Sequence, residues 1–78
     1  MKTPREMLDE LAAWTRLRSG RQTKVAAVIG LRRQQMNDYL TNRSVPTWAN
    51  GRKIEAFLRL SEERRRKVIG EEYHESET

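Results

Sequence analysis

The sequence predicts an all-α protein, a compact bundle of about five short helices. Apolar residues recur at intervals of three and four positions, which is the period of a helix with one buried face. Ser or Thr precedes several of these segments and Gly or Asn follows them, as at helix ends. No segment alternates apolar and polar residues as a strand would. With 78 residues the chain has room for one small domain, which buries roughly 60% of the unfolded surface.

The first helix is predicted to begin at Thr3. Thr3 is a hydroxyl N-cap, Pro4 occupies the first helical position, and Glu6 completes a capping box three residues after the cap. We expect this helix to end near Ser19-Gly20. Its apolar stripe consists of Met7, Leu8, Leu11 and Trp14.

Residues 22–41 are predicted to form two short helices joined by a tight turn, which is a helix-turn-helix. Gly30 can adopt the left-handed conformation that reverses the chain, and Leu31 then packs back into the core. Asn42 can end the second of these helices in the same conformation. The residues expected to face the core are Val25, Ala26, Val28 and Ile29 in helix 22–29, and Met36, Tyr39 and Leu40 in helix 33–41.

Two further helices are predicted. Thr47 caps one that reaches about Leu58, and Ser61 caps another of about 62–69. Both tryptophans, Trp14 and Trp48, are expected to anchor the core. The domain therefore spans residues 1–70, and the acidic remainder, 71–78, has too little apolar content to fold by itself.

The charge pattern favours a polyanionic partner. The formal net charge is +5, and residues 1–70 hold sixteen Lys or Arg against seven Asp or Glu, a net +9. The chain has no cysteine, which excludes disulfides, thiolate metal ligands and a thiol nucleophile. Its one histidine, His74, lies in the acidic remainder. We therefore predict no enzyme, no metal, no cofactor and no small-molecule substrate.

No apolar stretch is long enough for a membrane span or a signal segment, so we expect no membrane partner and a soluble, unexported protein.

The central motif resembles a known family. The positions that carry the resemblance are Gln22, Val25, Ala26, Ile29, Gly30 and Leu31, followed by Met36 and Tyr39. They are similar to the helix-turn-helix of the lambda-repressor and Cro-like superfamily, the Xre-type bacterial and phage regulators. The match is strongest over 22–46 and looser out to about residue 69. It departs where the family usually has Ser or Thr before the opening Gln, because this chain has Arg21, and where Asn42 replaces a glycine.

The resemblance implies a five-helix bundle, sequence-specific binding of double-stranded DNA, a homodimer on two half-sites, and a cytoplasmic bacterial or phage-encoded transcription regulator such as a repressor. It also implies that exposed early and middle residues of helix 33–41 contact bases. Arginine suits the acceptors of guanine, Gln and Asn suit adenine, and Asp can accept from the cytosine amino group. The predicted base-contacting residues are Arg33, Gln34, Asn37, Asp38 and Thr41.

Phosphates are expected to meet positive side chains and helix N-termini flanking the two helices. The predicted phosphate-contacting residues are Arg21, Gln22, Lys24, Arg32, Arg43 and Ser44. Arg52 and Lys53 extend this strip. With five or six such contacts, the logarithm of the DNA affinity should fall with the logarithm of salt concentration at a slope of about −5.

An alternative interpretation remains open. The same fold can serve as a protein-interaction module, such as an antitoxin or an adaptor, with the acidic tail or the Trp48 region as its contact surface. Such a module needs no ordered polar face on helix 33–41, whose polar residues would then be an ordinary solvated face.

For the homodimer expected of a DNA-binding regulator, the candidate interface residues are Leu60, Val68, Ile69 and Tyr73.

Overall fold

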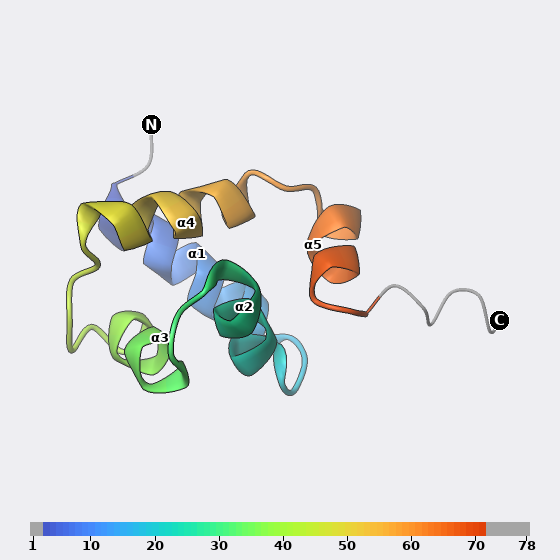
Figure 1. Cartoon of the computed structure of the whole chain (residues 1–78), viewed down its shortest axis with the longest axis horizontal. Helices are drawn as coiled ribbons and strands as arrows, with labels where there is room; N and C mark the ends of the chain where they lie inside the picture. The colour runs from blue at the N-terminus through green and yellow to red at the C-terminus, as the bar shows by residue number, and fades with distance from the viewer. Residues whose placement is uncertain (1–2, 72–78) are drawn as a thin grey trace, which may run out of the picture.

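The structure is a computed structural model and describes residues 3–71. The described part of the chain is all-helical and has no strand, which confirms the predicted fold class. Its five helices are shown in Figure 1. They are α1 (Pro4–Arg16), α2 (Arg21–Ile29), α3 (Arg33–Leu40), α4 (Trp48–Leu58) and α5 (Glu62–Val68).

The helix ends follow the predicted capping chemistry. The Thr3 hydroxyl accepts from the Glu6 N–H at 3.1 Å while the Glu6 carboxylate accepts from the Thr3 N–H at 2.8 Å, so the capping box is confirmed. The Thr47 and Ser61 hydroxyls cap α4 and α5 by accepting from the N–H groups of Asn50 and Arg64 at 3.2 Å, without the reciprocal bond of a capping box. α1 ends at Arg16, three residues before the predicted Ser19-Gly20, and 17–20 form the turn into α2.

Left-handed residues separate the middle elements. Gly30 has φ +83°, and Asn42, after α3, has φ +65°, as the sequence predicts. The Leu31 N–H donates to the Ala26 carbonyl at 2.8 Å, which closes the turn between α2 and α3. Leu31 itself is buried, so the corner is held by packing as well as by this bond.

The core lies where α1 meets the other helices, and Figure 1 shows α1 running behind α4 and toward α2. Its fully buried side chains are Leu11, Val25, Met36 and Ile54, which come from four different helices. Trp14 packs edge-on against Phe57, with ring centroids 5.5 Å apart. These contacts fix the positions of α2 and α3 in the bundle.

Two predicted core residues are exposed. The Trp48 side chain is 77% exposed, because Trp48 is the first residue of α4 and the core-facing positions of that helix are Ile54 and Phe57. Val28 is 47% exposed. The other residues of α2 predicted to face the core do so, since Val25 and Ala26 are buried and Ile29 is half-buried. The predictions for Trp48 and Val28 were therefore wrong.

Glu71 follows α5 and is part of the packed structure, although the sequence places it at the start of the acidic segment. It is buried against the first turn of α2, 50 positions earlier in the chain. The remainder of that segment, 72–78, which includes Tyr73 and His74, lies outside the described residues. No helix in the described part is long and apolar enough to span a bilayer.

Candidate nucleic-acid interface

The first turn of α2 offers backbone donors. Its N-cap is Gly20, in the left-handed conformation (φ +85°), and no side chain caps this end of the helix. The first N–H groups of any helix lack an acceptor within the helix, and the helix dipole adds a partial positive charge there. Among the residues that the structure describes, the start of α2 is therefore an electropositive helix end without a side-chain cap.

The outward face of α3 is polar and accessible. Arg33, Gln34 and Thr41 are exposed, and Asn37 and Asp38 are half-buried. The opposite face is sunk in the core, as predicted, through Met36, Tyr39 and Leu40. The five predicted base-contacting residues therefore lie away from the core side of one short helix.

Hydrogen bonds within this face fix two of its side chains. The Gln34 amide donates to the Asp38 carboxylate at 3.0 Å, from one helical turn away. The Thr41 hydroxyl donates to the Asn37 carbonyl at 2.8 Å. Because the Asp38 carboxylate accepts from Gln34, it orients that amide and offers the solvent one fewer acceptor position.

A shallow hollow joins α3 to the start of α2. Its volume is about 190 Å³, and the Gln22 amide donates across it to the Asn37 side-chain oxygen at 3.5 Å. A predicted phosphate-contacting residue is thus in contact with a predicted base-contacting one. The residues lining the hollow are Gln22, Thr23, Arg33, Gln34 and Asn37.

Thr23 is the lining residue that the sequence interpretation missed. It is exposed in the first turn of α2, directly after Gln22. The signal that could have found it is its position, because a hydroxyl in the first turn of a helix lies beside the unoccupied backbone donors.

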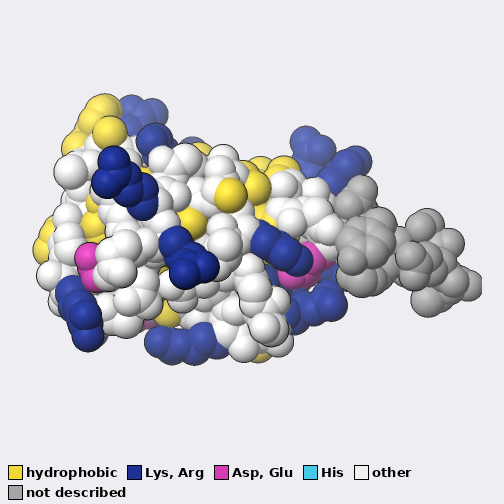
Figure 2. All heavy atoms as spheres, turned by 60° about the horizontal axis from the view of Figure 1, so that its bottom comes forward, with side chains coloured by type: hydrophobic (Ala, Val, Ile, Leu, Met, Phe, Trp, Pro, Cys, Tyr) yellow, Lys and Arg dark blue, Asp and Glu magenta, His cyan; other side chains and the backbone are white. Residues whose placement is uncertain are grey.

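Positive side chains surround these two helices. Lys24, Arg32 and Arg43 are exposed, as is Ser44, and none of these three cations forms an ion pair within the described part of the chain. Figure 2, turned so that the lower side of Figure 1 comes forward, shows separate Lys and Arg side chains spread over this face and fewer acidic ones. The face therefore attracts anions.

Arg21, the remaining predicted phosphate-contacting cation, is not on this exposed face. Its side chain is 3% exposed, and its Nε and Nη2 atoms donate to the Glu71 carboxylate at 3.1 and 3.0 Å. Its Nη1 donates to the Trp14 carbonyl at 3.1 Å, and the guanidinium stacks 3.8 Å from the centre of the Trp14 ring. The structure thus removes Arg21 from the accessible phosphate-contacting set and gives it a role in packing. The hydrogen bond from Arg21 lowers the pKa of Glu71, against the opposing effect of burial.

The candidate dimer residues are not all available. Val68 is 43% exposed and Leu60 is half-buried, whereas Ile69 is buried and Tyr73 lies outside the described residues. Val28, Leu60 and Val68 help to line a shallow apolar depression of about 330 Å³ between α2, α4 and α5.

The chain gives no significant match to protein-family models, to curated proteins or to solved structures. Residues 3–71 contain no group of three or more His, Asp or Glu side chains placed to hold a metal ion.

Proposed function

We propose that this protein is a sequence-specific, double-stranded DNA-binding transcription regulator of the Cro and repressor type, in which α2 and α3 act as a helix-turn-helix. The observation that carries the proposal is the joint polar surface of the two helices. Amide, hydroxyl and guanidinium groups of α3 lie beside the start of α2, which has no side-chain cap, and the cations around them form no ion pair within residues 3–71. A helix face that contacts only solvent is not expected to combine these features.

In this proposal α3 lies in the major groove. An α-helix with its side chains is about 10–12 Å across, close to the width of that groove. Arg33 reads guanine, and Gln34 and Asn37 read adenine through paired donor and acceptor atoms. Asp38 holds the Gln34 amide in position instead of contacting a base, in keeping with the 3.0 Å bond between them. Thr41 lies at the far end of the helix.

The phosphate contacts come from the flanks. The N–H groups of the first turn of α2 bind one phosphate, with Gln22 beside them. Lys24, Arg32 and Arg43 neutralise others, and Ser44 donates from the loop. With three cations engaged the salt slope is about −3, and with Arg52 and Lys53 also engaged it is about −5.

Two copies of the chain are required for tight binding. A single small module buries too little interface with DNA for high specific affinity, whereas a dimer on an inverted repeat doubles the contact. We therefore infer a homodimer on two half-sites about one helical turn apart.

The test is a selection of bound duplexes from a random pool, with the mass of the protein measured by sedimentation. We expect an inverted repeat to be enriched. Fluorescence anisotropy on the enriched duplex then compares the wild type with the double variant R33A/Q34A. We expect a loss of about tenfold or more, since each good base contact contributes about 1–3 kcal/mol of discrimination. The matched control is Arg64→Ala, which removes one exposed cation from α5.

The circular dichroism of R33A/Q34A should match the wild type, because both residues are exposed. If no sequence is enriched, and the double variant binds every duplex as the wild type does, the DNA-binding proposal is wrong. That result would favour the protein-interaction module on the same fold.

A further inference from the structure

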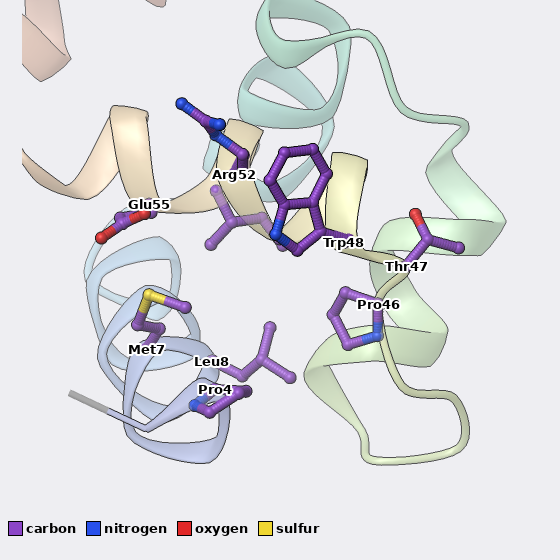
Figure 3. Close-up of a pocket in the computed structure, with 10 residues that line it drawn as sticks. Pro4, Met7, Leu8, Pro46, Thr47, Trp48, Arg52 and Glu55 are labelled. Atoms are coloured by element: carbon purple, nitrogen blue, oxygen red, sulfur yellow. The ribbon is translucent and has the colours of Figure 1, made fainter.

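A second hollow lies between the amino-terminal half of α1 and the start of α4. Its volume is about 390 Å³, within the range of sites that hold small molecules. Figure 3 shows Met7 and Leu8 rising from α1 on one side, with Trp48 and Pro46 on the other. Most of its walls are apolar. It shares no lining residue with the hollow between α2 and α3.

Gly51 lines this hollow and has free space beside it. It lies inside α4 on the side that lines the hollow, and a Cβ atom built there would meet no atom within 4 Å. Glycine in a helix interior is less stable than alanine, and here no neighbour requires it. A larger residue would favour the helix and fill the space. The residue present leaves the space free.

The rim carries an aromatic ring and an unpaired cation. The exposed Trp48 ring has the Arg52 guanidinium 4.9 Å from its centre, and within residues 3–71 Arg52 forms no ion pair. A guanidinium held near an aromatic ring keeps N–H groups that can donate to an acidic group. The nearby Glu55 carboxylate is already paired with Arg59 at 3.4 Å. Arg52 and Glu55 are the two charged residues that line the hollow, and of these Arg52 is the one that forms no ion pair within residues 3–71.

From these observations we propose that the hollow between α1 and α4 binds a small amphiphilic anion, a molecule with a flat apolar body and one acidic group. The apolar body lies between Met7, Leu8 and Trp48, and the acidic group meets Arg52. The hollow shares no lining residue with the α2–α3 hollow, and Arg52 is the one residue that both proposals use. The cavity variants at Gly51 therefore test this proposal separately from DNA binding.

The probe is 8-anilinonaphthalene-1-sulfonate, which combines aromatic rings with one sulfonate. Binding is followed on the purified full chain by the indole N–H signals in a two-dimensional ¹H–¹⁵N spectrum. The chain has two tryptophans, so one serves as an internal control. We expect the Trp48 signal to shift saturably and the Trp14 signal to stay, because Trp14 is buried and donates to Glu62 at 2.7 Å.

Two substitutions at one position test the cavity itself. Gly51→Leu should lower the affinity for the probe at least about tenfold by filling the hollow, which corresponds to about 1.4 kcal/mol. Gly51→Ala should leave the affinity within about twofold, since a single methyl occupies little of the space. Both variants should unfold at or above the wild-type temperature, because each removes a glycine from a helix.

Arg52→Gln tests the charge. It should lower the affinity for the probe by about two- to fivefold, as expected for one exposed charge contact, whereas Arg64→Gln should leave the affinity unchanged. N-phenyl-1-naphthylamine, which lacks the sulfonate, should respond equally to both variants.

The proposal is overturned if the Trp48 signal does not move, if Gly51→Leu binds the probe as the wild type does, or if Arg52→Gln and Arg64→Gln have equal effects. The last two outcomes would assign the binding to the general positive charge of the surface.

Discussion

Removing the negative charge of Glu71 is expected to destabilise the whole domain. In Glu71→Gln, the Arg21 cation stays buried and loses its charged partner, whose two bonds are 3.0 and 3.1 Å. Breaking a buried ion pair from one side costs about 3–5 kcal/mol. The Trp14 carbonyl at 3.1 Å and the Glu62 carboxylate at 3.7 Å remain near the guanidinium. We therefore expect a loss of about 2–3 kcal/mol, or about 10–20 °C in Tm for a domain of this size.

The effect should depend on pH with a defined sign. The pKa of Glu71 in the folded state lies below its ordinary value of 4.5, chiefly because of the hydrogen bond from Arg21. The ionised Glu71 carboxylate therefore contributes its full stabilisation above the pKa that Glu71 has in the unfolded chain. This stabilisation is lost as the pH falls through the pKa that Glu71 has in the folded protein. The difference in stability between the wild type and Glu71→Gln should be largest near neutral pH and should shrink on acidification below about 4.5.

Urea unfolding followed by circular dichroism measures both effects. The control is Glu55→Gln, which breaks an exposed i,i+4 pair with Arg59 and should cost under about 1 kcal/mol. Replacing both members of the buried pair, as in R21M/E71L, should recover part of the lost stability, because Arg21 is no longer left buried without Glu71, although Arg18 and Arg66 still lose their ion pairs with Glu71. An unfolding midpoint for Glu71→Gln equal to that of the control, or a stability difference that acid does not reduce, would refute this account of the pair.

Three other outcomes are expected. On the selected DNA, Lys24→Gln and Arg43→Gln should each reduce the magnitude of the salt slope by about 1, and Arg64→Gln should leave it unchanged; anisotropy titrations at four salt concentrations measure this. Gly51→Ala should raise the free energy of unfolding by about 0.5–1 kcal/mol, measured in urea, because its side chain meets no neighbour. Gly30→Ala should lower it by about 1–2 kcal/mol, because an L-residue is strained at φ +83°.

Features set by neighbouring residues could be predicted from the sequence. The caps at Thr3, Thr47 and Ser61 depend on a hydroxyl and an N–H three positions later, so a short segment contains the whole interaction. The left-handed turns at Gly30 and Asn42 are likewise local. The polar outer face and the buried inner face of α3 also followed from its helical period.

Features set by distant parts of the chain could not be predicted. Arg21 and Glu71 are 50 residues apart, and no periodicity links them, so the sequence predicts Arg21 to be a surface cation. The apolar pattern predicts Trp48 to be a core residue, but its position at the first turn of α4 turns it outward. The hollow beside it also escaped prediction, since it requires α1 and α4 to be placed together.

The buried pair gives a physical reason for the uncapped start of α2. A Ser or Thr cap would place a side-chain oxygen on the first-turn N–H groups and use one of the donors that an anion needs. Gly20 leaves those donors unoccupied and contributes no capping bond. The start of the helix is held instead by Arg21, whose side chain runs inward to Trp14 and Glu71. In the DNA-binding proposal the side chain and the backbone of the first turn of α2 have different roles. The Arg21 side chain holds the helix to the core, and the backbone N–H groups face the phosphate.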